Sequence, residues 1–369
     1  MKTILSRTLG TLFFAASCVG AILLAAASFY DKSPYKGVFY IVLALLAASS
    51  GVFGFVLPAG VLRKTWLIVS LIFSLLAVVL PLAAATVGYH LMFRGRSDTN
   101  AYTQSAADFP RLTCEECTFT SSVGVTLAGY WYTDASAPKK DAVVIFAHGY
   151  QSGGHGVYLS SIARFAYDGY TVFAYDATAH GKSGGNGIGG MPRGVLDLSR
   201  AIEYVKEHCP DMPILLCGHS WGGYSVLNVL NKHPEVGGVV SMSGFDRSVD
   251  LIEAHVPAAF KALKQYLIAA EFLTFGKTAF ESAVTGIKKS AAHIMIVHSS
   301  DDPAVPPSYS VSHYKDAFGD DDRITYKLYE NRGHSPFVGG EAVKGAPVGG
   351  IDENLYREIL AFYDDRIDQ

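Results

Sequence analysis

The first quarter of this chain almost lacks charge. Residues 1–96 hold eight basic side chains and one acidic side chain, and three runs, 8–30, 37–62 and 65–93, contain no Asp, Glu, Lys or Arg. Each run is long enough to cross the roughly 30 Å hydrocarbon core of a bilayer as a helix. We therefore predict a membrane region over residues 1–96, with three transmembrane helices and the lipid bilayer as a partner.

A cleavable signal peptide is the alternative for the first run, because Lys2 and Arg7 precede an apolar stretch that ends in Ala25-Ala26-Ala27. Basic residues are balanced on the two sides of the predicted spans, so their count alone sets no orientation. The first span decides the prediction, since basic residues precede it and Asp31 follows it. We expect a multi-pass membrane protein with a cytoplasmic N-terminus and the rest of the chain outside the cytoplasm.

Beyond residue 96 the chain lacks a positive balance and the usual cofactor motifs. The whole chain has a net charge of −3 and residues 1–96 contribute +7, which leaves −10 for the remainder. Such a domain repels nucleic acid, so no nucleic-acid partner is expected. No H-E-x-x-H, paired Cys-His spacing or carboxylate cluster indicates a metal, and neither G-x-x-x-x-G-K-[ST] nor a strand-linked G-x-G-x-x-G indicates a nucleotide. No cofactor is predicted.

Cysteine is scarce, with five in the chain. Cys114 and Cys117 form a C-x-x-C pair, which would be either a small disulfide outside the cell or two free thiols. Two cysteines cannot complete a tetrahedral zinc site. Cys209 and Cys217 are expected to be buried apolar residues.

One serine stands between glycines at the end of an apolar run. Residues 213–216 predict a short buried strand, residues 224–232 predict a helix, and Gly218-His219-Ser220-Trp221-Gly222 lies between them. This is the context of a nucleophile elbow, a sharp turn in which side chains at the two flanking glycines would collide with neighbouring backbone. The turn would push the Ser220 hydroxyl outward, toward a substrate and a base.

Three further strand ends follow the order that such a nucleophile needs. A buried strand over 141–147 ends in His148-Gly149-Tyr150, where a backbone N–H can face a developing oxyanion. A strand over 294–298 precedes Asp301 and Asp302, and a strand over 324–329 precedes His334. Serine, then aspartate, then histidine is the chain order of the α/β-hydrolase triad.

Residues 110–369 resemble the α/β-hydrolase superfamily, most closely its monoacylglycerol-lipase and serine-aminopeptidase-like branch. Asp176 and the following His180-Gly181-Lys182-Ser183 are similar to that branch's D-x-x-G-H-G-x-S signature, although residues 177–179 lack its Arg-Gly. The resemblance implies an α/β fold, with a mostly parallel sheet and helices on both faces, over residues 113–369. It also implies a helical lid at about 246–292. Residues 97–112 lie between the last predicted span and the first strand, and we expect them to be a linker.

The resemblance also assigns roles. Ser220 would be the nucleophile, His334 the general base and Asp302 the residue that orients it. Asp302 is preferred to Asp301 because the family pattern D-x-x-V fits residues 302–305, which leaves Asp301 as a solvated loop charge. The oxyanion hole would be the backbone N–H groups of Tyr150 and Trp221. The remaining histidines near these loops are expected to be structural: His148, His155, His180, His219 and His298.

The expected elements are a hairpin (118–120 with 125–132) and helices over 156–168, 194–207, 224–232, 307–318 and 353–366. Residues 257–273 have helical apolar spacing through Phe260, Leu263, Leu267 and Ala270. That stripe would either line an acyl pocket or cover the edge of the sheet.

The sequence therefore predicts a membrane-anchored, esterase- or lipase-like serine hydrolase that cleaves ester or thioester bonds of small-molecule or lipid substrates. Amide cleavage and acyl transfer are enzymatic alternatives, and a non-catalytic membrane sensor or scaffold is the alternative of another class. The sequence sets no oligomeric state.

Overall fold

The computed structural model of the chain describes residues 2–56, 60–261, 263–339 and 350–367. They divide into two compact units. One unit comprises Met1–Met92 with Val256–Phe280, and the other comprises Phe93–His255 with Glu281–Gln369. The larger unit holds the sheet and is described first.

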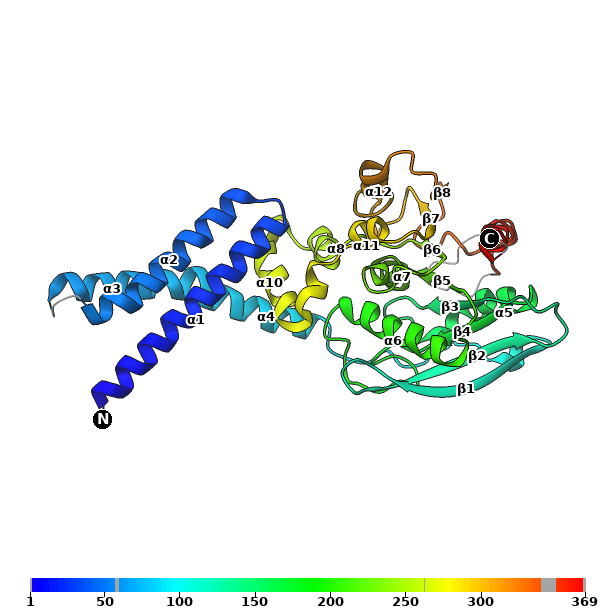
Figure 1. Cartoon of the computed structure of the whole chain (residues 1–369), viewed down its shortest axis with the longest axis horizontal. Coiled ribbons are helices and arrows are strands. Elements are labelled where there is room, and N and C mark those ends of the chain that lie inside the picture. The colour runs from blue at the N-terminus through cyan, green and yellow to red at the C-terminus, as the bar shows by residue number, and fades with distance from the viewer. Residues whose placement is uncertain (1, 57–59, 262, 340–349, 368–369) are drawn as a thin grey trace. The chain divides into compact units, whose positions relative to one another are not determined.

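An eight-stranded sheet forms the centre of the larger unit, in the order β1-β2-β4-β3-β5-β6-β7-β8 (Figure 1). Only the pairs β1–β2 and β2–β4 are antiparallel, and the other pairs are parallel. The central strands are apolar on both faces because helices cover both sides. The strands are β1 (Leu112–Thr120), β2 (Thr126–Asp134), β3 (Val143–Ala147), β4 (Thr171–Tyr175), β5 (Ile214–His219), β6 (Gly238–Met242), β7 (His293–Ser299) and β8 (Ile324–Tyr329).

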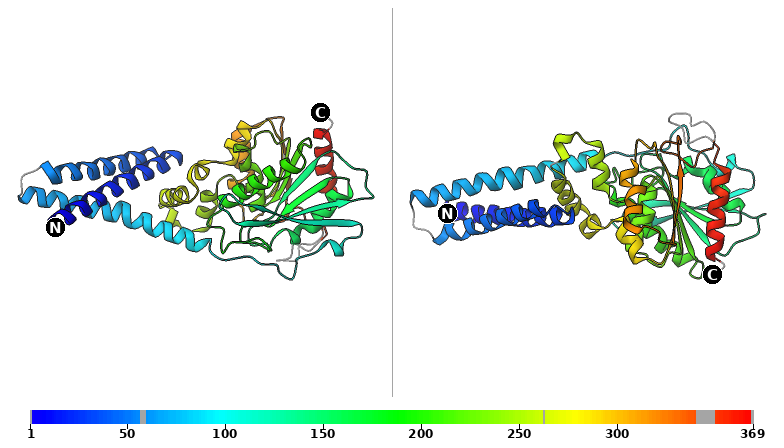
Figure 2. Two further views of the ribbon diagram at one scale, coloured as in Figure 1. Left: turned by 60° about the horizontal axis from the view of Figure 1, so that its bottom comes forward. Right: turned by 90° about the horizontal axis from the view of Figure 1, so that it is seen from above.

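Helices cover both faces of this sheet, as predicted. Figure 2 shows the red C-terminal helix on one side of the strands and the orange helix of residues 311–318 on the other. Buried residues of α5 and α13 share one hydrophobic core with side chains of β3 and β4. The helices are α5 (Leu159–Tyr167), α6 (Pro192–His208), α7 (Trp221–Asn228), α8 (Ser248–His255), α11 (Ala283–Lys289), α12 (Val311–Phe318) and α13 (Glu353–Ile367). The chain thus has the predicted α/β-hydrolase fold.

Residues 97–112, which we predicted to be a linker, group with the sheet domain, and the residues around their start contact its loops. We call residues 94–104 the strap. Its Arg96 guanidinium donates hydrogen bonds to three loop carbonyls, those of Gly181 at 2.9 Å, Ser183 at 2.8 Å and Gly185 at 2.7 Å. The Ser97 Oγ accepts a hydrogen bond from the Gly153 N–H at 3.0 Å. The planar, five-donor fork of an arginine suits such a set of diverging carbonyls.

The smaller unit contains the apolar helices. They are α1 (Lys2–Tyr30), α2 (Pro34–Val56), α3 (Val61–Ser74), a π-helical turn (Leu75–Val79) and α4 (Leu80–Met92). By length and composition, Leu12–Tyr30 and Lys64–Met92 could each cross a bilayer. In α2, the part whose side chains are described is a shorter apolar helix, Pro34–Ser50. The side chains of residues 51–59, which belong to the predicted second span, lie outside the described residues.

Part of the predicted lid belongs to this smaller unit. Helices α9 (Ala258–Lys261) and α10 (Lys264–Phe275) fall within the predicted lid, yet they group with the N-terminal helices, whereas α8 and α11 stay with the sheet. Tyr266 and Ala269 of α10 share a buried core with Ala21, Leu24 and Tyr40. The apolar stripe identified in the sequence is packed only in part: Leu263 is 41% exposed and Leu267 is half-buried, whereas Ala270 is buried. The Phe260 side chain lies outside the described residues.

Polar side chains reinforce this packing within the smaller unit. The Lys264 ammonium lies 2.8 Å from Asp31, and the Tyr89 hydroxyl donates to Glu271 at 2.5 Å. The Tyr40 hydroxyl donates to Tyr266, which in turn donates to the Ala77 carbonyl. Buried ion pairs and hydrogen bonds of this kind fix one arrangement more than they add stability.

Candidate active site

Ser220 occupies a strained turn between β5 and α7. Its φ is 56° and its ψ is −113°, a conformation that costs a non-glycine residue on the order of 1–3 kcal/mol. A Cβ on Gly218 would lie 2.5 Å from the Gly222 backbone, and one on Gly222 would lie 2.0 Å from the Ala147 carbonyl oxygen. The two glycines are therefore required by close approach, and the turn itself is held by a 2.8 Å hydrogen bond from the Ser220 N–H to Met242.

The structure brings Ser220, Asp302 and His334 together. The Nε2 atom of His334 lies 2.8 Å from the Ser220 Oγ, and its Nδ1 atom lies 2.9 and 3.0 Å from the two Asp302 oxygens. Burial raises the pKa of Asp302, but the hydrogen bond and charge of His334 outweigh it, so this pKa lies below its usual value. Asp302 is thus an ionised acceptor, and it requires the Nδ1 atom of His334 to carry a proton.

Asp301 has a different place in the same loop. Its Oδ1 accepts hydrogen bonds from the Ser299 hydroxyl at 2.5 Å and the Gly333 N–H at 3.0 Å. Asp301 therefore ties the loop that carries His334 to the end of β7, a role beyond that of the solvated charge we expected. The structure describes no contact between Asp301 and the His334 imidazole.

The two predicted oxyanion donors lie on loops that flank the serine. Tyr150 follows β3, and Trp221 is the first residue of α7, where helix N–H groups point outward without intrahelical partners. Within the described residues, neither N–H donates a hydrogen bond to another protein group. Their rings form an edge contact with centroids 5.9 Å apart. This arrangement leaves both N–H groups available to an anionic oxygen.

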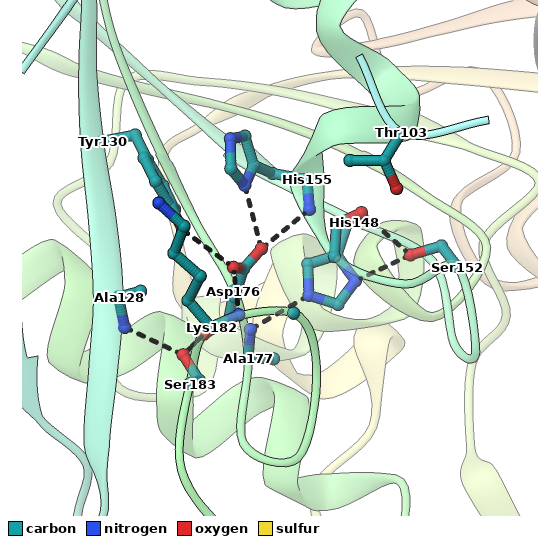
Figure 3. A network of polar contacts seen from close by, with 12 residues as sticks. Thr103, Ala128, Tyr130, His148, Ser152, His155, Asp176, Ala177, Lys182 and Ser183 are labelled. Carbon is teal, nitrogen blue, oxygen red and sulfur yellow. Dashed lines mark hydrogen bonds and ion pairs between the residues drawn. The ribbon is translucent and has the colours of Figure 1, made fainter. Parts of the chain in front are cut away.

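A buried carboxylate organises the neighbouring loops (Figure 3). Asp176, at the end of β4, accepts hydrogen bonds from the His155 N–H at 2.9 Å, the His155 Nδ1–H at 2.8 Å, the Tyr130 hydroxyl at 3.0 Å and the Lys182 N–H at 2.9 Å. Burial raises the Asp176 pKa, but hydrogen bonds with His155 outweigh it and keep the carboxylate ionised. A Cβ on Gly181 would lie 2.3 Å from this carboxylate. The sequence signature contains Asp176, Gly181 and Lys182, but neither Tyr130 nor His155, so it did not predict this network.

His148 joins the oxyanion loop to the same region. Its Nε2 accepts the Ala177 N–H at 3.0 Å (Figure 3), and its Nδ1–H donates to the Gly149 carbonyl at 2.8 Å. Burial lowers its pKa to about 3, so the ring is neutral. This contact network agrees with a structural role for His148.

The described part of the chain contains no group of three or more His, Cys, Asp or Glu side chains that could hold a metal ion. All five cysteines are free thiols. Cys114 and Cys117 are three residues apart on β1, so their side chains point to opposite faces of the strand, which excludes the disulfide alternative.

Comparisons with known proteins agree with this geometry. The family model "Serine aminopeptidase, S33" matches residues 138–270. The monoacylglycerol lipase of Mycolicibacterium smegmatis is 29% identical over 134 residues, which is 36% of this chain and 47% of that protein. A putative non-heme haloperoxidase of Mycobacterium phage D29 is 29% identical over 112 residues, 30% of this chain and 38% of that protein. The alignments thus span less than half the length of either relative.

Solved structures show the same fold. An esterase from Pyrococcus furiosus superposes with a TM-score of 0.56 and 19% identity, covering 74% of this chain and 99% of that one. An acetyl xylan esterase from Paenibacillus superposes with a TM-score of 0.52 and 16% identity, covering 76% of this chain and 92% of that one. The chain thus has the α/β-hydrolase fold, and over residues 138–270 it is similar to the serine-aminopeptidase and monoacylglycerol-lipase branch of that superfamily.

Proposed function

We propose that the chain is a membrane-anchored serine hydrolase that cleaves carboxylic ester or thioester bonds through an acyl-enzyme. One observation carries the proposal: an unbroken hydrogen-bonded line from Asp302 through His334 to Ser220. A serine hydroxyl is a poor nucleophile at neutral pH, and it needs a base within hydrogen-bond reach. His334 meets that requirement at 2.8 Å.

The proton positions define the reaction. Because Asp302 fixes the proton of His334 on Nδ1, its Nε2 atom accepts the Ser220 proton as Oγ attacks the carbonyl carbon. The resulting oxyanion accepts hydrogen bonds from the Tyr150 and Trp221 N–H groups, each worth roughly 3–4 kcal/mol of the barrier. The protonated His334 then gives its proton to the leaving oxygen or sulfur. Water attacks the acyl-serine in the second half of the reaction, with His334 again as base.

Two considerations favour esters of lipid origin. One relative is named a monoacylglycerol lipase, and the N-terminal unit presents apolar helices long enough for a bilayer. Amide cleavage is the alternative that the name of the matching family favours, since that family model describes a serine aminopeptidase. Acyl transfer differs from hydrolysis only in the group that accepts the acyl chain from Ser220. A non-catalytic scaffold would leave the assembled triad without a function.

We expect the full-length protein to be labelled by a fluorophosphonate probe at Ser220 and to hydrolyse p-nitrophenyl esters. A series from acetyl to palmitoyl, with thioester analogues and aminoacyl p-nitroanilides in parallel, separates the alternatives. Faster cleavage of the anilides would favour an aminopeptidase, and ester cleavage that requires an added alcohol would indicate acyl transfer. Absence of labelling and turnover would leave the scaffold as the function.

Packing of the first helix supports a retained anchor over a cleaved signal peptide. Ala21, Leu24 and Ala25 of α1 are buried in the core that they share with α2 and α10. Cleavage after α1 would remove the packing contacts that this helix makes with the rest of that core, and in a bilayer such contacts hold helices together. We therefore propose that α1 remains part of the mature protein.

A tagged protein tests anchoring and orientation. We expect an N-terminal epitope tag to persist in the mature chain and to remain in the membrane fraction after carbonate extraction. Cys114 is exposed as a residue, although partial burial of its thiol raises the thiol pKa, so mildly alkaline conditions favour labelling. A membrane-impermeant maleimide should label Cys114 in intact cells, with Cys114→Ser as the control. Loss of the tag would support a cleaved signal peptide instead of an anchor. Labelling of Cys114 only after lysis would place the domain in the cytoplasm.

A further inference from the structure

We propose that Tyr158 and His219 are positioning residues that connect the oxyanion loop to the loop of His334 through one buried chain of hydrogen bonds. The proposal rests on the proposed function, because it concerns how the same site is held. It gives a role to the residue that precedes the nucleophile, for which the sequence predicted only packing or loop hydrogen bonding.

This buried chain of side chains and backbone groups consists of three hydrogen bonds. The Gly149 N–H donates to the Tyr158 hydroxyl oxygen at 3.1 Å. The Tyr158 hydroxyl lies 2.9 Å from the Nδ1 atom of His219, and the Nε2 atom of His219 lies 2.7 Å from the His334 carbonyl oxygen. Residues separated by 115 positions, His219 and His334, are thereby joined directly.

Only one assignment of protons satisfies all three hydrogen bonds. The His334 carbonyl can only accept, so the Nε2 atom of His219 carries a proton and donates. Burial lowers the pKa of His219 to about 3, so the ring is neutral and its Nδ1 atom is an acceptor. The Tyr158 O–H therefore donates to Nδ1, which leaves its oxygen to accept the Gly149 N–H. The chain is thus directional, from the oxyanion loop to the histidine loop.

Both ends of this chain lie beside the reacting groups. Gly149 immediately precedes Tyr150, whose N–H is a proposed oxyanion donor, and the accepting carbonyl belongs to the proposed base itself. Tyr158 and His219 are each 5% exposed, and the Phe337 ring packs on both, with centroid distances of 6.0 and 4.8 Å. Because these buried groups are closely packed, a shift of the Gly149 loop is transmitted to the His334 loop. Displacements of about 1 Å in a site of this kind cost on the order of 100-fold in rate.

Three substitutions dissect the chain. Tyr158→Phe removes only the hydroxyl in the middle. His219→Gln keeps an N–H donor near the position of Nε2 but removes the acceptor for Tyr158. His219→Asn keeps an acceptor near the position of Nδ1 but cannot reach the His334 carbonyl. We expect each variant to lower kcat about 10- to 100-fold while KM changes less than about threefold, since the ester-binding surface is untouched.

The double variant Tyr158→Phe/His219→Gln provides the decisive comparison. If the two residues act through one set of hydrogen bonds, kcat of the double variant should be no more than about twofold below that of the worse single variant, because the first break already uncouples the loops. Affinity for butylboronic acid, which forms a tetrahedral adduct with a nucleophilic serine, should fall in parallel with kcat/KM. The matched control is Tyr363→Phe, which deletes a buried hydroxyl that donates to the Leu216 carbonyl at 2.6 Å, away from the triad. This control should lower the Tm without changing kcat.

Wild-type kcat in Tyr158→Phe and both His219 variants would overturn the proposal. Two results would instead assign Tyr158 and His219 to general stability. One is that the losses of kcat multiply in the double variant, and the other is that Tyr363→Phe also loses kcat in proportion to its fall in Tm. If one variant fails to fold, the remaining single variants and the boronate affinities still decide. An inactive and unlabelled wild type would instead refute the proposed function, so the two failures are distinguishable.

Discussion

Ser220→Ala is expected to abolish fluorophosphonate labelling and to lower ester turnover at least about 10⁴-fold, while the free energy of unfolding changes by less than about 1 kcal/mol. The substitution removes one hydroxyl whose only described side-chain partner is His334. Alanine takes the same backbone conformation at φ 56° as serine does, so the turn is no more strained than before. The nucleophile is lost and the fold is kept.

The measurement is labelling and kcat in parallel with thermal unfolding. Ser225→Ala is the matched control, because its Oγ is also on α7 and donates to the Trp221 carbonyl at 2.7 Å, away from the triad. It should lose some stability but retain labelling. Labelling of Ser220→Ala at a different serine would show that the nucleophile is assigned wrongly.

Asp302→Asn is expected to lower kcat by about 10⁴-fold with little change in KM. The Oδ1 atom of Asp302 accepts the N–H groups of Ala304 and Val305, both at 2.9 Å. In the variant those two donors hold the amide oxygen at the same place, which turns the amide nitrogen toward the Nδ1 atom of His334. An amide nitrogen only donates, so the Nδ1 atom of His334 must accept, its proton moves to Nε2, and the imidazole can no longer take the proton of Ser220.

Asp301→Asn is the matched comparison. Its amide oxygen can still accept from Ser299 and Gly333, so we expect kcat within about threefold of the wild type. A loss in Asp301→Asn equal to that in Asp302→Asn would reverse the choice between the two carboxylates.

The sequence predicted the sheet and the loops of the triad because both depend on local patterns. Apolar runs identify buried strands, and residues that follow successive parallel strands collect at one edge of a sheet, which is how Ser220, Asp302 and His334 are brought together. The glycines of the elbow were predictable for the same reason, since they answer a local steric demand.

Other features depend on contacts that no local pattern encodes. Arg96 binds backbone carbonyls, which every residue has, so nothing in residues 181–185 marks them as its partners. The helix α10 has an apolar stripe, but a stripe says only that a face is covered and not what covers it. The hydrogen-bond relay through His219 escaped prediction because its other members are a backbone carbonyl, a backbone N–H and a tyrosine distant in the sequence.

The strap and the triad also differ in when they can form during biosynthesis. The carbonyl partners of Arg96 lie 85 to 89 residues further along the chain. At about 5–20 residues per second, the ribosome reaches them on the order of ten seconds after Arg96. His334 follows His219 by a further 115 residues. Contacts of such long range form late in folding, so a nascent chain acquires a competent nucleophile only when synthesis of the sheet domain is nearly complete.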